Sequence, residues 1–227
     1  MGGVQKTTRR KVRNVPRVHE PRIRLDVEER RSQLVALGLQ HFGERAYDDV
    51  SIDEIADSAG VSKGLLYHYF PTKRAYYAAC VREAAAQLVA NTERHDDPAD
   101  PLGSLQIGLD AYLTYVKAHA KAYATLLRSG VGVDPEIARI VDETRAMFVE
   151  RLVAGFTLGP TSALLDAPVA RLALRGWVGF VEAASLGWVE AVAAGASTPS
   201  QEEVRELLAG ALMEIVSSAV RTVSAPA

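Results

Sequence analysis

The feature that most constrains the fold is the stretch from residue 51 to residue 70, which requires two short helices to meet at a tight turn. Ser51 and Ser62 each precede an apolar run and carry the short polar side chain that caps a helix N-terminus. Glu54 lies three residues after Ser51, at the spacing of a capping box. Gly60 stands between the two helices, where a left-handed backbone carries no Cβ penalty.

The apolar residues of this stretch fit two helices that cross. Ala56 is small enough for the crossing point, and Leu66 supplies a buried side chain in the second helix. Their joint spacing with the caps predicts a helix-turn-helix, a motif whose second helix enters the major groove of DNA.

Periodic apolar residues predict helices on both sides of this motif, and nothing in the sequence reads as a strand pair or a repeat. Val35, Leu39 and Phe42 share one face of a first helix, and Pro71 and Thr72 begin a longer helix. The predicted helices outside the motif span residues 27–45, 72–93, 102–119, 120–129, 135–156, 168–193 and 199–220. We therefore predict an all-α chain.

Basic charge is concentrated at the N-terminus, although the formal net charge of the chain is −2. Glu20 is the only acidic residue before Leu25, and no apolar periodicity is present there. We predict a flexible basic arm over residues 1–26, which either reaches DNA or is a disordered leader. Its cations are Lys6, Arg9, Arg10, Lys11, Arg13, Arg17, Arg22 and Arg24.

The second helix of the motif begins with groups that suit a DNA groove. Ser62, Lys63 and Gly64 place short polar and basic groups at its N-terminal end, where free N–H groups favour phosphate. The aromatic and imidazole groups that follow can reach phosphate oxygens or base edges. Two alternatives to DNA contact remain. Tyr67 and Tyr69 would pack between the short helices, and Lys63 would be an ordinary solvated charge.

The residues of this region resemble the signature of the TetR family of transcriptional regulators. Residues 50–56, 59–64 and 70–73 read VSIDEIA, AGVSKG and FPTK, with Tyr67 between them, and the resemblance covers roughly residues 30–80. It implies that a set of side chains lies at the DNA surface and that Lys73 contacts backbone phosphate. We assign DNA binding to Ser51, Ser62, Lys63, Gly64, Leu65, Tyr67, His68, Tyr69 and Lys73.

Two residues depart from the family pattern. Tyr69 stands where histidine is frequent, which leaves its DNA contact open. Ala46 stands where the family usually ends the first helix with glycine. A left-handed alanine would cost on the order of 1 kcal/mol, so we expect the turn after the first helix to take another form.

The second half of the chain has candidate residues for binding a small molecule. Four residues recur at intervals of three or four along one helical register, and they form either a pocket wall or an ordinary core stripe. A later apolar helix carries two charges that either orient a ligand or form a structural ion pair or a dimer contact. The effector candidates are Tyr112, Tyr115, His119, Tyr123, Arg128, Arg175, Trp177 and Glu182.

The last two long helices are candidates for a homodimer interface. The first of them has small residues along one side, which let another helix approach closely, and the second supplies large apolar side chains. The resemblance implies a four-helix bundle made by both subunits, whereas packing inside one subunit is the alternative. The residues are Gly176, Gly179, Ala183, Ala184 and Gly187 in one helix and Leu207, Leu208, Leu212 and Ile215 in the other.

Several classes of protein are disfavoured. Cys80 is the only cysteine, so an intrachain disulfide is impossible and no thiol pair has metal-ligand spacing. We see neither a nucleophile elbow nor a phosphate-binding glycine loop, and we expect no enzyme activity, metal or cofactor. No signal peptide or apolar stretch of about eighteen residues is evident, so we expect a cytoplasmic protein outside the membrane.

These observations predict three segments: a flexible arm (1–26), a three-helix helix-turn-helix DNA-binding domain (27–74) and a larger α-helical effector-binding and dimerisation domain (75–227). The expected function is ligand-responsive regulation of transcription by a repressor. Such a repressor binds a palindromic operator of double-stranded DNA as a homodimer and is released by a small hydrophobic effector. An activator is an open alternative, as is an α-helical small-molecule or lipid carrier that does not bind DNA, although a carrier leaves residues 51–73 unexplained.

Overall fold

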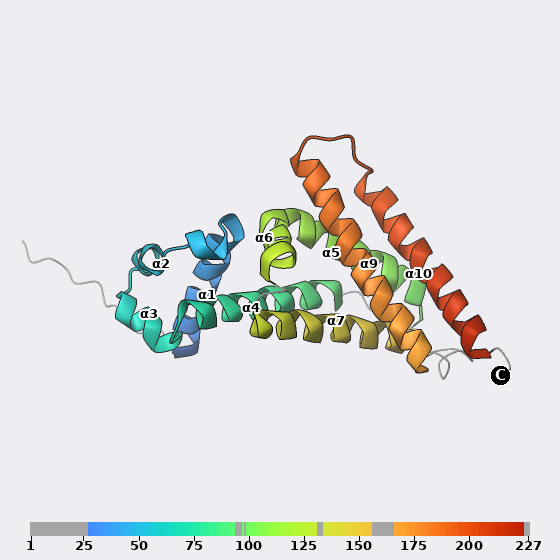
Figure 1. Ribbon diagram of the computed structural model, residues 1–227, viewed down its shortest axis with the longest axis horizontal. Helices are drawn as coiled ribbons and strands as arrows, with labels where there is room; N and C mark the ends of the chain where they lie inside the picture. Colours follow the sequence, from blue (N-terminus) through green and yellow to red (C-terminus); the bar gives the residue numbers. More distant parts are fainter. Residues whose placement is uncertain (1–26, 94–96, 98, 131–133, 156–165, 225–227) are drawn as a thin grey trace, which may run out of the picture.

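The computed structural model describes residues 27–93, 97, 99–130, 134–155 and 166–224, and all the regular structure in these ranges is helical (Figure 1). The predicted all-α class is confirmed. The predicted basic arm, residues 1–26, lies outside the described residues.

The N-terminal half contains α1 (Val27–Glu44), α2 (Ile52–Ser58), α3 (Lys63–Tyr69) and the long α4 (Lys73–Glu93). The Ser51 hydroxyl accepts from the Asp53 N–H at 3.2 Å, and the Ser62 hydroxyl accepts from the Leu65 N–H at 3.1 Å. Both predicted caps are present. Gly60 has φ +62°, so the turn between α2 and α3 uses the left-handed conformation that glycine allows.

The turn after α1 takes another form, as expected for alanine. Ala46 is extended, with φ −61° and ψ 152°, and a short 3₁₀ helix (Tyr47–Asp49) follows. The predicted capping box differs in one partner: among the bonds of the described residues, the Glu54 carboxylate accepts from Arg45 at 2.5 Å rather than from the Ser51 backbone. Arg45 at the end of α1 offers a charged donor, which makes a stronger bond than a neutral N–H.

One apolar core holds α1 to α4 together. Ile55, Ala56 and Leu66 are buried where α2 and α3 cross, as predicted. The Tyr76 hydroxyl of α4 donates to the Leu34 carbonyl of α1. α1 and α4 approach closely at Gly38, where an added Cβ would lie 2.7 Å from Cζ of Tyr76.

The C-terminal half contains α5 (Pro101–Ala118), α6 (Ala120–Thr125) with a π-helical turn (Leu126–Gly130), α7 (Pro135–Gly155), α9 (Pro168–Ala193) and α10 (Gln201–Ser224). Figure 1 shows α4 and α7 side by side, and α9 beside α10. Asp134 caps α7 by accepting from the Glu136 and Ile137 N–H groups, as its position before Pro135 predicted. A second apolar core joins α5, α7, α9 and α10.

The last helix, α10, bears on two expectations: the absence of a membrane-spanning segment and the leucines assigned to a dimer interface. One 18-residue window of this helix has a mean hydropathy of 1.4, which is apolar enough to cross a membrane by length and composition alone, so the expectation that no segment approaches this limit is wrong. It packs against α9 and α5, however. Leu208 and Leu212, predicted for the dimer interface, are fully buried in the core of the subunit, and Ile215 packs against that core.

Candidate functional site

The N-terminal half of α3 is the exposed surface of the helix-turn-helix. Ser62, Lys63 and Gly64 are exposed, and Leu65 and Tyr67 retain 38% and 36% of their surface. Leu66 faces the opposite way and is fully buried. The helix therefore has one face in the core and one face free for a partner, and α3 lies at one end of the molecule (Figure 1).

The Lys63 ammonium already has an acidic neighbour. Its Nζ lies 2.9 Å from Oδ2 of Asp53 in α2, and both side chains are exposed. The hydrogen bond to Asp53 raises the pKa of Lys63. Such an exposed ion pair is weak, so a phosphate can take the place of Asp53.

Lys73 is held at the start of α4 by the turn after α1. Its Nζ donates to the Asp48 carbonyl at 3.3 Å and lies 4.6 Å from the centre of the Tyr47 ring. These contacts fix the direction of the side chain, and they leave N–H donors for another acceptor.

The remaining assigned residues of this region divide into two kinds. His68 is exposed, and its ring lies 5.7 Å from the ring of Tyr69. Tyr69 is half-buried and packs against the N-terminal core, so it has a structural role in α3. Ser51 is partly buried, and its hydroxyl caps α2.

A cavity of about 830 Å³ lies between α4, α5, α6, α7 and α9. Six of the eight residues assigned to an effector line it: Tyr112, Tyr115, His119, Tyr123, Trp177 and Glu182. Its volume falls in the range of small-molecule sites, which are concave and mostly apolar with a few polar groups. The alternative of an ordinary core stripe also holds in part, because Tyr112 belongs to the C-terminal core and Tyr123 packs against it.

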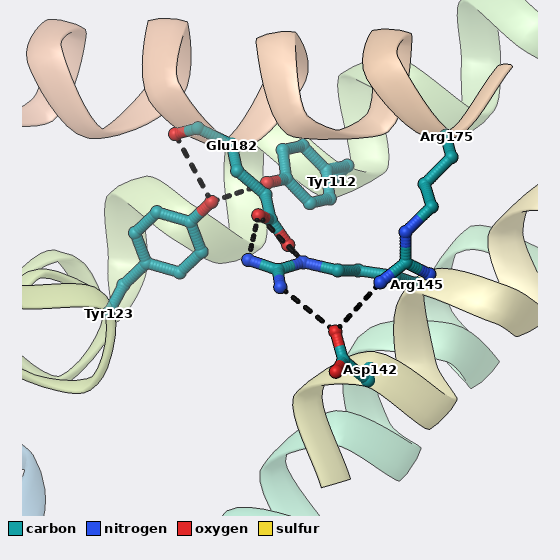
Figure 2. A network of polar contacts seen from close by, with 6 residues as sticks. All are labelled: Tyr112, Tyr123, Asp142, Arg145, Arg175 and Glu182. Atoms are coloured by element: carbon teal, nitrogen blue, oxygen red, sulfur yellow. Dashed lines mark hydrogen bonds and ion pairs between the residues drawn. The ribbon is translucent and has the colours of Figure 1, made fainter. Parts of the chain in front are cut away.

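Tyr112 and Tyr123 both line this cavity, and their hydroxyl groups meet (Figure 2). The Tyr112 and Tyr123 oxygens are 2.6 Å apart, and Tyr123 also donates to the Glu182 carbonyl at 3.5 Å. Burial raises the pKa of both phenols, so both are neutral and carry a proton to donate. The Tyr115 hydroxyl instead donates to the Ala84 carbonyl of α4 at 3.1 Å.

The two charges predicted in α9 do not pair with each other. Glu182 receives Nε and Nη2 of Arg145 in α7, the closest contact being 2.6 Å, and Arg175 reaches Asp142 at 3.0 Å (Figure 2). Arg145 also reaches Asp142 at 3.1 Å, so that the four side chains connect α7 with α9. Both charges form ion pairs within the subunit, with partners from α7 rather than with each other.

Arg128 and Arg175 lie outside the residues that line the cavity. Arg128 is exposed and pairs with Glu190 at 2.5 Å, and Arg175 is held by Asp142 on the α7–α9 surface. The sequence reasoning also missed Arg151, Thr144 and Phe148 of α7, which do line the cavity. Their spacing of three and four residues along one helix face is the signal that could have identified them.

The cavity also touches the N-terminal half. Leu39, Phe42 and Gly43 of α1 belong to its lining, and α6 packs against α1. α4 contributes Cys80 to the N-terminal core and also supplies a wall of the cavity. In the part of the chain that the structure describes, no group of three His, Cys, Asp or Glu side chains could hold a metal ion.

Comparison with known domains identifies both halves. Residues 34–80 match the family described as bacterial regulatory proteins of the tetR family, and residues 101–214 match the tetracyclin repressor-like C-terminal domain. The chain belongs to the TetR family. TetR-family regulators bind DNA and typically act as dimers with small-molecule effectors.

Individual relatives agree with this membership. The HTH-type transcriptional activator FasR of Mycolicibacterium smegmatis is 29% identical over 116 residues, which are 51% of this chain and 53% of FasR. The HTH-type transcriptional regulator RutR of Escherichia coli K12 is 26% identical over 160 residues, 67% of this chain and 63% of RutR. The chain thus spans between about half and two thirds of these relatives.

A crystal structure of a TetR-family regulator from Streptomyces coelicolor extends the likeness to most of the fold. Its TM-score is 0.69 at 28% sequence identity, and the match covers 88% of this chain and 90% of that one. The arrangement of a helix-turn-helix N-terminal half followed by a helical C-terminal half is therefore shared with this TetR-family structure.

Proposed function

We propose that this TetR-family protein is a ligand-responsive repressor that binds a near-palindromic operator as a homodimer and is released by a small hydrophobic effector. The single observation that carries the proposal is that one cavity borders α1 and α4 of the helix-turn-helix half as well as the helices of the C-terminal half. We also propose the division at residues 74 and 75, with α4 serving both parts.

The DNA-facing role of α3 is supported by its exposed residues. Ser62, Lys63 and Gly64 lie at its N-terminal end, which is the end that enters the major groove in helix-turn-helix proteins. Lys63 and Lys73 supply the cations for phosphate, and Tyr67 and His68 are exposed on the same short helix. Tyr69 contributes mainly by holding α3 to the core.

The exposed sides of α9 and α10 support a homodimer. In α9 a strip of small residues is open to solvent, and apart from the adjacent residues and the backbone of α9 itself, no atom lies within 4 Å of a Cβ added at Gly176, Gly179 or Gly187. Leu207 of α10 is 58% exposed, and Phe180 of α9 is 38% exposed. A second copy of this surface would cover the apolar residues, and the thin strip would let helices approach closely.

Dimerisation would fix the spacing of the two α3 helices. They must lie about 34–36 Å apart, or a multiple of this distance, to enter successive major grooves on one side of DNA. An effector that favours another arrangement of α1, α4 and α6 around the cavity would change that spacing and weaken DNA binding.

A selection from random double-stranded DNA tests the proposal. Wild type is compared with Lys63→Ala and Tyr67→Ala at fixed salt concentration, and Arg139→Ala, which removes an exposed cation from α7, is the matched control. We expect a near-palindrome that both α3 variants weaken and the control does not. Failure to enrich any sequence over several salt concentrations would instead favour an α-helical carrier.

Placement of the selected site in front of a reporter gene tests the direction of regulation. Repression predicts that reporter expression rises when the protein is removed. A fall in expression would make the protein an activator, as the name of FasR says of that relative.

A further inference from the structure

The residues that line the cavity extend along most of two helices. Its lining runs from Tyr77 to Thr92 along α4 and from Ile140 to Gly155 along α7. Fifteen residues of helix rise about 22 Å, whereas a sphere of about 830 Å³ would be only about 12 Å across. The two helices run in the same direction, because Arg74 pairs with Asp134 at one end and Arg151 bonds to Thr92 at the other. The shape is that of a channel, which suits an elongated ligand.

The tyrosine pair lies near the middle of this channel. The Tyr112 ring is 6.5 Å from the ring of Phe148, which stands about half-way between Ile140 and Gly155 on α7. Apolar residues line the channel on both sides of this point: Val81, Leu126 and Ile140 toward the helix-turn-helix, and Leu88, Leu105 and Leu152 toward the other end, where the Arg151 guanidinium bonds to Thr92. The arrangement places a hydrogen-bonding point between two apolar sections.

The hydroxyl pair can donate to a ligand with little loss. At 3.5 Å, the bond from Tyr123 to the Glu182 carbonyl is at the outer limit for a hydrogen bond. That carbonyl lies inside α9, where helical hydrogen bonding already serves it. A ligand oxygen at ordinary O–H···O distance would therefore receive the Tyr123 proton in preference to the carbonyl.

The surroundings of the pair favour an uncharged ligand group. The nearby Glu182 carboxylate forms an ion pair with Arg145, so these two side chains together carry no net charge that would attract an ionic ligand group. Burial raises the pKa of both tyrosines, and the negative charge of Glu182 raises both further. The conditions that disfavour a phenolate at this point also disfavour a carboxylate of a ligand.

We propose that the effector is an elongated, uncharged apolar molecule with a hydrogen-bond acceptor part-way along its length, such as a ketone or ester carbonyl. The acceptor bonds to the Tyr112–Tyr123 hydroxyl pair, and the apolar sections on either side fill the two ends of the channel. This inference rests on the proposed function, because it specifies the chemistry of the effector.

Direct binding to the purified full-length protein tests it. The probes are a symmetric dialkyl ketone of about fifteen carbons, short enough for the channel, and the linear carboxylate of the same length. Binding is followed by tryptophan fluorescence, since Trp177 lines the cavity. We expect the ketone to bind at least about tenfold more tightly than the carboxylate, which corresponds to one well-made hydrogen bond and an avoided buried charge.

Variants that lose one oxygen atom identify the anchor. Tyr112→Phe and Tyr123→Phe should each weaken ketone binding by about fivefold to tenfold. Tyr47→Phe is the matched control, because Tyr47 lies outside the residues that line the cavity, and it should change binding by less than about twofold. Circular dichroism confirms that each variant is folded.

The outcomes separate this inference from the proposed function. Tighter binding of the carboxylate, an equal loss in Tyr47→Phe, or no binding of either probe overturns the inference. The DNA selection described above is performed without any probe. If no DNA sequence is enriched, the proposed DNA-binding function is overturned. If an operator is enriched but the ketone does not bind, only the proposed chemistry of the effector is overturned.

Discussion

Polar side chains are used differently around α3 and around the cavity. In the helix-turn-helix, Ser51 and Ser62 cap helices at the surface, and Lys63 meets Asp53 in solvent. Around the cavity, polar side chains pair across helices away from solvent, as Tyr112 does with Tyr123. Exposed pairs contribute little to stability, whereas loss of one partner of a buried pair is expensive. Stability of the first region therefore depends on apolar packing, and stability of the second depends also on intact pairs.

Leu66→Ala should have the largest effect on the N-terminal half. Leu66 is fully buried where α2 and α3 cross, and truncation leaves a cavity that costs about 3 kcal/mol of unfolding free energy. Urea unfolding measures this loss. Leu65→Ala on the same helix is the control, because Leu65 is exposed and should lose less than about 1 kcal/mol. Equal losses would show that α3 is not oriented as described.

Arg145→Ala should have the largest polar effect. It leaves the Glu182 carboxylate, which is 18% exposed, without its partner and should cost about 2 kcal/mol, reduced from the fully buried case by solvent access. Urea unfolding is again the measurement. The double variant Arg145→Met with Glu182→Met should recover most of the loss, since it removes both charges together. A double variant as unstable as the single one would argue against the pairing.

Gly38→Ala tests the close approach of α1 and α4. The new Cβ would lie 2.7 Å from the Tyr76 ring, so we expect a net loss of about 1 kcal/mol despite the better helix propensity of alanine. Gly43→Ala, on the same helix, meets only Ala122 at 3.9 Å and should be neutral or slightly stabilising. Melting temperatures of the two variants make the comparison. The packing is contradicted if Gly38→Ala is the more stable of them.

Asp53→Asn should have the smallest effect, and it acts on DNA binding. Removal of the carboxylate frees the Lys63 ammonium for phosphate, and we expect operator affinity to rise by about twofold to fivefold at low salt. Fluorescence anisotropy with the selected operator measures the change. The gain should disappear in the Lys63→Ala background, and a gain that persists there would come from general charge repulsion rather than from the pair.

The same difference between the two regions explains what the sequence could predict. Helix starts at Ser51, Ser62 and Asp134, and the turn at Gly60, depend on residues within a few positions of one another. Such local rules can be read from one sequence. The partner of Glu54 was predicted incorrectly because Arg45 comes from the preceding helix.

Prediction of the polar pairs around the cavity would require contacts between distant parts of the chain, which local sequence rules do not supply. Tyr112 and Tyr123 could be placed on a common wall by helical spacing, but Arg145 lies 37 residues from Glu182 and meets it only because α7 crosses α9. Arg175 likewise bonds to Asp142 of α7 rather than to Glu182 of its own helix. Leu208 and Leu212 were assigned to a dimer interface because they are bulky apolar residues of the last helix, but both are fully buried inside the subunit.

The double use of α4 has a consequence for protein engineering. A chimera that joins this sensor to another DNA reader at residue 75 would divide a helix whose Cys80 belongs to one core while its Ala84 accepts from Tyr115 of the other half. A junction after Glu93 keeps α4 with the reader but replaces one wall of the channel and the Thr92 partner of Arg151. Exchange of specificities should therefore graft the exposed side of α3 alone and leave every helix boundary of the chain in place.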